Sequence, residues 1–279
     1  MARGLVAPAV GEQEAVAERA DRQAREQEDA EQGGLAHGIV LAATRAMELF
    51  SYHLISAPVH SVAARLWSTS ALRRVEGLRH AECLIPMTMG LGVTRPSRYH
   101  PQTLVLFALW ESEAHLARFL ASPPYRVFER DGWHLRLRFY RRWGTYRGID
   151  DATVYPDLAK PDGPVVGVTF ARLKLTHAVR FARWGKPVEA QVRDHPGMVR
   201  AVVAYRPFTT FSTFSVWRSE QHMLDMVRGR NAGVDGTSHR DAMKERVRKD
   251  FHHEFTTMRL IPLSEHGQWP EAMRLLPPG

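Results

Sequence analysis

Short apolar runs with the length of strands alternate with amphipathic stretches along most of the chain. Residues 102–110 (QTLVLFALW) predict a buried strand, and Ser112 is a favourable N-cap for a helix over residues 113–120. The same pattern of a strand followed by a capping serine occurs again in the second half of the chain. There, residues 208–217 (FTTFSTFSVW) predict a strand, and Ser219 predicts the start of a helix. One unit of structure therefore occurs twice.

The two copies share one register around the predicted helix start. Gly77 corresponds to Gly197, each in a turn that precedes a strand. His115 and His222 fall at the same helical position, so we interpret them as parts of a shared helix start with a structural role. The matched residues are Trp110, Ser112, Glu113 and His115 in the first copy and Trp217, Ser219, Glu220 and His222 in the second.

The predicted elements of each copy follow the order strand, helix, strand, strand, helix, strand, which is a ferredoxin-like unit. A sheet with helices on one face needs a second sheet to cover the other face. We therefore predict an α+β fold in which two tandem ferredoxin-like half-barrels form an intramolecular dimeric α+β barrel. Strands are expected at 37–47, 75–87, 102–110, 134–140, 165–174, 198–206, 208–217 and 254–263. Helices are expected in the latter part of 49–67, at 113–120, at 122–130, at 176–194, after Ser219 and at 238–251.

Composition divides the chain into five parts. Residues 1–36 are rich in Ala, Glu, Gln and Arg and contain no aromatic residue, so we predict a mobile tail that buries no core. The two halves span 37–147 and 165–270, residues 148–164 have the Gly, Pro and Asp content of a linker, and 271–279 form a C-terminal tail. Within the second half, the helix over 176–194 is expected to break near residues 185–187, where Gly and Pro occur.

Side-chain alternation separates the two faces of the strand at 208–217. Phe214 and Val216 share one face, which suits packing against helices, while Thr213, Ser215 and Trp217 share a mixed, more polar face. We expect the polar face to line a cavity. The corresponding strand of the first half leaves neither face polar, so the pocket is expected mainly in the second half.

Charge and cysteine content narrow the possible partners. The 279 residues carry a formal net charge of +8, a balance found in proteins that meet nucleic acid, acidic surfaces or anionic cofactors. The densest basic run, residues 136–147, has aromatic residues between its arginines, but it is typical of a strand with a solvated face, and no nucleic-acid module accompanies it.

Cys83 is the only cysteine, which excludes an internal disulfide and a thiolate-held cluster. No segment has the length of a membrane span or an apolar signal core, so we expect a cytoplasmic protein.

His239 is the residue with the clearest possible metal chemistry. It lies in the first turn of the predicted helix at 238–251, at the position that Tyr125 occupies in the first half. An imidazole on a helix beside a cavity can ligate a haem iron. A surface histidine without function is the alternative that spacing alone leaves open.

Three stretches resemble the spheroidene monooxygenase family of carotenoid biosynthesis. They are residues 90–112, a Gly-rich loop followed by a strand that ends in Trp; residues 195–219, a Pro-Gly turn followed by a Thr-Phe-Ser strand; and residues 238–269, a His-led helix with a final strand and a terminal Gly-x-Trp. The order and spacing of these stretches extend over about residues 37–270. The resemblance implies a tandem barrel that carries out haem-dependent oxygenation of an apolar substrate, with His239 as axial ligand.

If haem (heme b) binds to His239, chemistry suggests roles for further residues. Thr213, Ser215 and Arg259 are the expected catalytic residues on the sheet opposite the iron. Arg206 and Arg240 are expected to pair with the propionates, and Trp217 to contact the cofactor. The chain has no cluster cysteines and no GxGxxG loop, so electrons are expected from an external ferredoxin-type donor unless peroxide replaces O2.

Three other functions remain open at this point. The same barrel could act as a cofactor-free monooxygenase on a substrate that itself activates oxygen. It could also be a haem lyase or peroxidase, or a non-catalytic ligand-binding barrel. Fold alone does not choose among them.

Overall fold

The computed structural model describes residues 47–67, 72–125, 132–158, 163–230, 238–269 and 276. The predicted tail at 1–36 lies outside these residues, as do the strand expected at 37–47, except for Met47, and the C-terminal tail at 271–279, except for Leu276.

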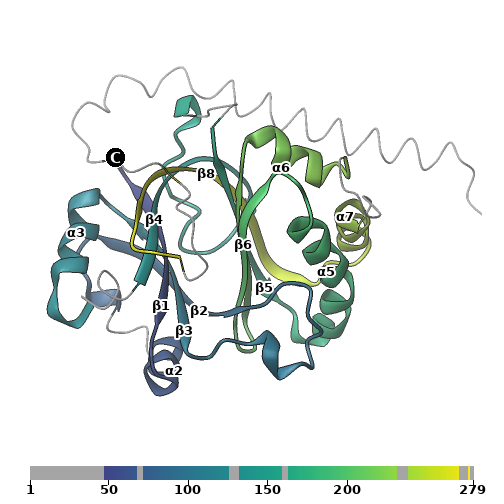
Figure 1. The fold of residues 1–279 in the computed structure, drawn as a ribbon, viewed down its shortest axis with the longest axis horizontal. Helices are drawn as coiled ribbons and strands as arrows, with labels where there is room; N and C mark the ends of the chain where they lie inside the picture. Colours follow the sequence, from purple (N-terminus) through teal and green to yellow (C-terminus); the bar gives the residue numbers. More distant parts are fainter. Residues whose placement is uncertain are drawn as a thin grey trace, which may run out of the picture. The chain divides into compact units, whose positions relative to one another are not determined.

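Eight described strands form one closed antiparallel barrel (Figure 1), which confirms the predicted fold class. The order around the barrel is β1-β3-β2-β6-β7-β5-β8-β4, so each half repeats the same internal order. The halves join through the pairs β2–β6 and β4–β8. The strands are β1 (Leu49–Ser56), β2 (Leu78–Met87), β3 (Thr103–Trp110), β4 (Gly132–Thr145), β5 (Val165–Leu173), β6 (Met198–Arg206), β7 (Thr210–Trp217) and β8 (His252–His266).

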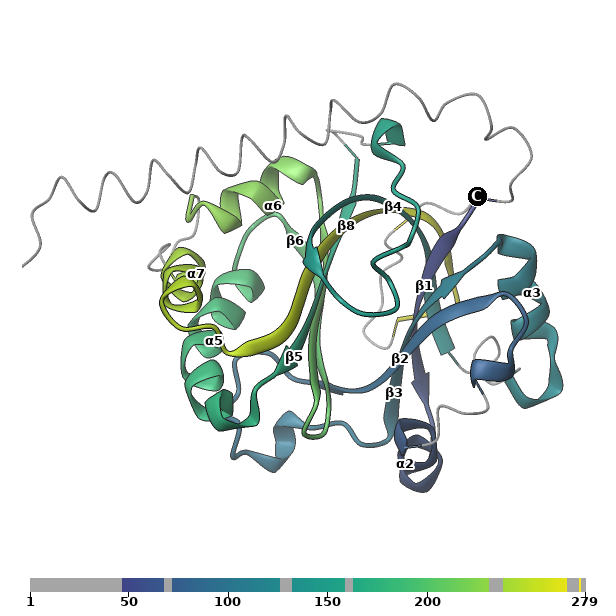
Figure 2. The ribbon, with the colours of Figure 1, turned by 180° about the vertical axis from the view of Figure 1, so that it is seen from behind.

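The helices lie on the outside of the barrel, those of each half beside their own strands (Figures 1 and 2). The first half carries α2 (Val59–Trp67) and α3 (Glu113–Ala121), and the second carries α5 (Ala178–Arg193), α6 (Glu220–Val227) and α7 (Ser238–Arg248). Single 3₁₀ turns are η3 (Leu72–Arg74), η4 (Pro96–Arg98), η5 (Pro123–Tyr125), η6 (Pro156–Leu158) and η7 (Leu175–His177). No helix among the described residues has both the length and the apolar character needed to cross a membrane.

Aromatic and aliphatic side chains from all eight strands fill the barrel interior. The rings of Tyr52 and Phe214, from opposite halves, stack with centroids 3.9 Å apart, and those of Phe107 and Phe170 are 5.1 Å apart. Each sheet therefore covers the inner face of the other, as the duplication predicts. The described part of the predicted linker also contributes to this core, through Ile149 and Ala152.

The expected assignment of faces on β7 is wrong. Phe214 and Val216 point into the barrel interior, whereas Trp217 belongs to the apolar cluster beneath the second-half helices. Thr213 and Ser215 share the face of Trp217 and so lie on the helix side of the sheet. The reason is that the interior receives side chains from eight strands and excludes water more completely than the helix layer does, so it takes the larger apolar side chains.

The helix α5 is continuous from residue 178 to residue 193, so the break expected near 185–187 is also wrong. Pro187 lies inside the helix and removes one backbone hydrogen bond. Two buried side chains in the following turns stabilise the helix. Arg98 donates to the carboxylate of Glu189, and the amide of Gln191 donates to the carbonyl of Met226. Tertiary contacts here outweigh the local cost of the proline.

The repeated phrase has a direct structural explanation. Ser112 and Ser219 cap α3 and α6, and each Oγ lies 2.8 Å from Nδ1 of the histidine three residues later. The rings of those histidines, His115 and His222, rest on Gly77 and Gly197, where a Cβ atom would approach the imidazole to 2.0 and 2.3 Å. The geometry supports the structural role that we expected for both histidines.

Substituting alanine for Gly77 is expected to lower the free energy of unfolding by roughly 2 kcal/mol or more. The new methyl group would overlap the His115 ring, and the backbone at this glycine has a φ of 72°, which disfavours alanine. Urea unfolding followed by far-UV circular dichroism measures the change. Gly185→Ala is the matched control, because nothing lies within 4 Å of a Cβ atom at that helical position. Equal stability of the two variants would contradict the packing role of Gly77.

Candidate functional site

His239 occupies the first turn of α7, as the sequence predicts. Its backbone N–H donates to Oε1 of Gln191 on α5 at 2.9 Å, which fixes the start of α7 against its neighbouring helix. The helix start is therefore held by a side chain from α5.

The imidazole of His239 is set up as a neutral ligand. Burial lowers its pKa, and a hydrogen bond with the backbone of Val227 opposes that shift only in part. Val227 itself packs against the apolar cluster under the second-half helices. A ring held at one nitrogen by a backbone carbonyl presents its other nitrogen to a metal, which is the usual orientation of ligating histidines. The ring is thus a neutral nitrogen donor, which is the chemical type of ligand that a haem iron takes from histidine.

The helix-facing side of the second-half sheet is partly open, unlike its counterpart in the first half. On β7 the residues Phe211, Thr213 and Ser215 are half-buried, whereas the equivalent face of β3 is fully buried. Hydroxyl groups continue across the sheet, since Oγ1 of Thr169 lies 3.2 Å from Oγ1 of Thr257. A polar, accessible strip therefore runs along the helix-facing side of the second-half sheet. His239 lies on α7, which packs mainly against α5 and α6.

Most residues predicted on this strip do lie on it, but several already have partners. The indole Nε1–H of Trp217 donates to Oγ of Ser215 at 2.9 Å, and that hydroxyl donates to the carbonyl of Gly167 at 3.3 Å. Arg259 forms an ion pair with Glu220 of α6, and its guanidinium lies 4.3 Å from the ring centroid of Trp143. Arg259 is therefore a bound, buried cation. Among these candidates, Thr213 has a side-chain hydroxyl with no hydrogen bond to another described residue, although its backbone pairs with β5 and β6.

The two arginines expected to hold propionates do not converge on His239. Arg240 is exposed on α7. Arg206, at the end of β6, forms an ion pair with Glu82 at 2.7 Å and donates from Nε to the carbonyl of Cys83. Arg206 is therefore bound at the junction of the halves, where β2 and β6 pair, a contact that local sequence does not reveal; its role toward a propionate stays a prediction.

A cavity of about 560 Å³ opens beside α5 at the lower edge of the second half. Phe211 is part of its wall, so the cavity begins two residues before Thr213 on the same face of β7. Other apolar walls come from the β2–β3 connection, from α5 and from the β6–β7 hairpin: Met87, Leu91, Val93, Phe181, Tyr205 and Phe208. The arrangement suits an apolar organic molecule of moderate size.

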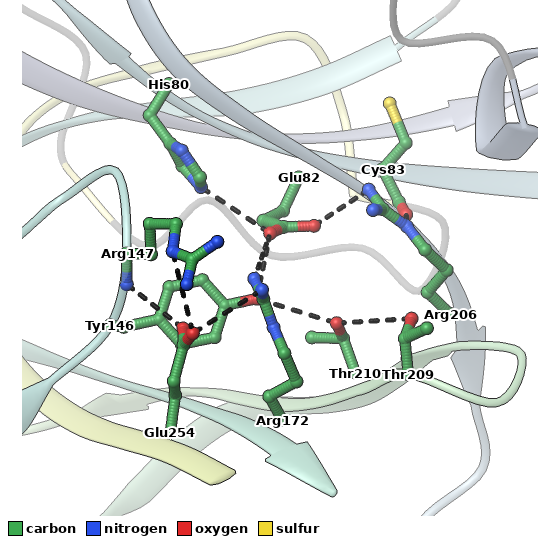
Figure 3. Close-up of polar contacts among 10 residues, drawn as sticks. All are labelled: His80, Glu82, Cys83, Tyr146, Arg147, Arg172, Arg206, Thr209, Thr210 and Glu254. Atoms are coloured by element: carbon green, nitrogen blue, oxygen red, sulfur yellow. Dashed lines mark hydrogen bonds and ion pairs between the residues drawn. The ribbon is translucent and has the colours of Figure 1, made fainter.

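A second polar cluster, which the sequence did not indicate, surrounds Glu82 (Figure 3). The hydroxyl of Tyr146 donates to Oε1 of Glu82 at 2.8 Å, and Arg172 lies 3.9 Å from the same oxygen. His80 Nε2 approaches it to 3.6 Å. A cavity of about 460 Å³ lies next to the cluster. Since Arg172 and Arg206 belong to the second half and Glu82 to the first, these contacts tie the halves together.

The electrostatics of this cluster favour a permanent carboxylate. Burial alone would raise the pKa of Glu82, but contacts with His80, Arg206 and Tyr146 bring the pKa below its ordinary value. Burial, followed by the nearby Glu82 charge, raises the pKa of Tyr146 to about 12. Glu82 is therefore an ionised acceptor at neutral pH and not a proton donor. Only its position, on a strand with apolar neighbours, could have drawn attention to it.

Within the described residues, no group of three or more His, Cys, Asp and Glu side chains is placed to hold a metal ion. A haem iron needs only one protein ligand, so this finding does not bear on His239.

Three solved structures align with most of the chain at low identity. A candidate monooxygenase from Fusobacterium nucleatum subsp. nucleatum is 10% identical, with 80% of this chain and 95% of that chain covered and a TM-score of 0.35. An aldoxime dehydratase in complex with butyraldoxime is 10% identical, with 78% of this chain and 81% of that chain covered and a TM-score of 0.46. An anthrone oxidase-like protein is 13% identical, with 78% of this chain and 92% of that chain covered and a TM-score of 0.30. No protein-family model and no curated protein matches the sequence. The fold is assigned from the strand order and registers, and the resemblance to spheroidene monooxygenases stays a prediction.

Proposed function

We propose that the protein is a haem-dependent monooxygenase that acts on a small apolar organic metabolite. The observation that supports the proposal is the environment of His239, a partly exposed imidazole whose pKa burial lowers and which the backbone of Val227 orients on α7. Haem, when bound, would supply an iron that activates O2 or peroxide, with electrons from an external donor in the first case.

Residues of the chain have distinct roles in this proposal. His239 holds the iron, and Gln191 positions α7 by accepting from the His239 backbone. The hydroxyl of Thr213, on the partly open strip of β7, would offer a hydrogen-bond donor to a polar group of the bound substrate. The apolar cavity binds substrate and excludes water, with Phe181 and Phe211 as walls.

An absorption spectrum of protein produced with a haem supply tests the proposal. We expect a Soret band in the wild-type protein and its loss or shift in His239→Ala, because the variant lacks the nitrogen that ligates iron. Far-UV circular dichroism of both proteins establishes that the fold is unchanged.

The matched control is His253→Ala, which removes an exposed histidine from β8. Its Soret band is expected to equal that of the wild type. A protein that stays colourless after haem titration would overturn the haem assignment, and oxygen consumption by that colourless protein would favour a cofactor-free monooxygenase. Equal Soret bands in the wild type and His239→Ala would move the ligand elsewhere.

A further inference from the structure

Exposed apolar side chains gather at the mouth of the 560 Å³ cavity. Val93, Leu175, Val179 and Phe208 are 52%, 58%, 86% and 76% exposed, and all four line this cavity. They come from three separate segments, namely the β2–β3 connection, the beginning of α5 with its preceding turn, and the β6–β7 hairpin. These segments meet at the lower edge of the barrel (Figure 2). Apolar groups concentrated in this way mark an interaction surface.

The hairpin holds one of these side chains in a costly conformation. Phe208 has a φ of 63°. Among the described residues other than glycine, no second one has a positive φ. An aromatic residue here gives up backbone stability that Asn or Gly would retain, yet its ring lies mostly in solvent. The ring therefore has no folding contact that accounts for it, which points to a partner.

The segments that form this face are basic. Residues 87–101, 172–188 and 205–213 contain no Asp or Glu. Arg95, Arg183 and Lys186 are exposed on these segments. The ion pairs that the described part of these segments makes belong to other arginines, namely Arg98, Arg172, Arg180 and Arg206. The acidic residue in the cavity wall, Glu189, is buried, and its Oε1 lies 2.6 Å from Nη2 of Arg98 in an ion pair. The face thus combines apolar tips with uncompensated positive charge.

We propose that this face docks on an anionic lipid bilayer, with Val93, Leu175, Val179 and Phe208 entering the interface between headgroups and acyl chains. The combination of protruding apolar side chains and flanking Arg and Lys residues is the one that binds proteins to such surfaces. A protein partner would require complementary acidic and apolar surface, and a second copy would place like charges against each other, because this face is basic throughout. Charge complementarity therefore favours the bilayer.

Docking in this orientation would open the cavity toward the membrane. Apolar molecules dissolved in the bilayer could then enter between Val179 and Phe208 without crossing water. This last step rests on the proposed function, whereas binding to lipid does not depend on haem or on turnover.

Flotation of the full chain with lipid vesicles tests the inference. We expect the wild-type protein to float with phosphatidylcholine vesicles that contain phosphatidylglycerol, and to stay largely unbound with phosphatidylcholine alone. The double variant Val179→Ser/Phe208→Asn should bind at least about tenfold more weakly, since two apolar side chains leave the interface. Asparagine tolerates the backbone at residue 208, so a loss of binding would not arise from unfolding. Lys186→Gln should weaken binding about fivefold.

Matched controls lie on α7, away from the cavity. Val247 is 87% exposed, so Val247→Ser removes a valine as exposed as Val179, and Lys244→Gln removes an exposed lysine. Both controls should float like the wild type. Equal losses in control and test variants, or equal binding to neutral and anionic vesicles, would overturn the inference. So would an absence of vesicle binding together with a dimer that the double variant disrupts, which would assign the face to self-association. The outcome is independent of any Soret band.

Discussion

Replacing Glu82 with alanine is expected to lower the free energy of unfolding by about 3 kcal/mol, because two partly buried arginines and the Tyr146 hydroxyl lose their buried acceptor. The carboxylate is 3% exposed and accepts from Tyr146 while it faces Arg206 at 2.7 Å. Glu82→Gln keeps an acceptor for the tyrosine but loses the charge, so about half of the effect is expected. Urea unfolding at neutral pH measures both variants.

Glu113→Ala is the control for this experiment. Glu113 also pairs with an arginine, Arg136, but it is 61% exposed, so a loss of less than about 1 kcal/mol is expected. The double variant Glu82→Leu/Arg206→Met should recover most of the stability, because it removes both charges together. Similar losses in Glu82→Ala and Glu113→Ala would show that the cluster does not hold the halves together.

Acidification from pH 7 to pH 5 is expected to destabilise the protein by roughly 4 kcal/mol through two buried histidines. His53 and His134 lie on paired strands with ring centroids 4.8 Å apart, and His266 stacks on His134 at 4.6 Å. Burial first, then His266 and Arg136, lowers the pKa of His134 to about 3, and burial followed by His134 lowers that of His53 well below its ordinary value.

The direction of this effect follows from proton binding. Both histidines stay neutral in the folded protein and take up a proton in the unfolded chain once the pH falls below about 6.5, so stability falls as the pH decreases. Each contributes about 2 kcal/mol between pH 7 and pH 5. His134→Leu should halve the loss of unfolding free energy between pH 7 and pH 5. Above pH 7, the difference in unfolding free energy between the variant and the wild type should be constant. A loss as steep in His134→Leu as in the wild type would refute the assignment.

Local sequence was sufficient for most of the elements and for their duplication, although it did not predict β1 at Leu49–Ser56 or the continuity of α5. Ser112 and Ser219 predicted the helix starts, and the alternation on β7 correctly separated Phe214 from Thr213. Those features depend on interactions within a few residues, such as an N-cap hydrogen bond or the two-residue period of a strand. The tandem arrangement followed from the repetition of those local signals.

Only the tertiary structure decided which face of each strand is inside and which charges meet. A period of two defines two faces but not which of them points to the other sheet, so Phe214 was placed on the wrong side. The partners of Glu82 come from β5, β6 and the end of β4, and the apolar rim of the cavity comes from three distant segments. Such contacts arise when the barrel closes, because closure brings together strand ends that are far apart in the sequence.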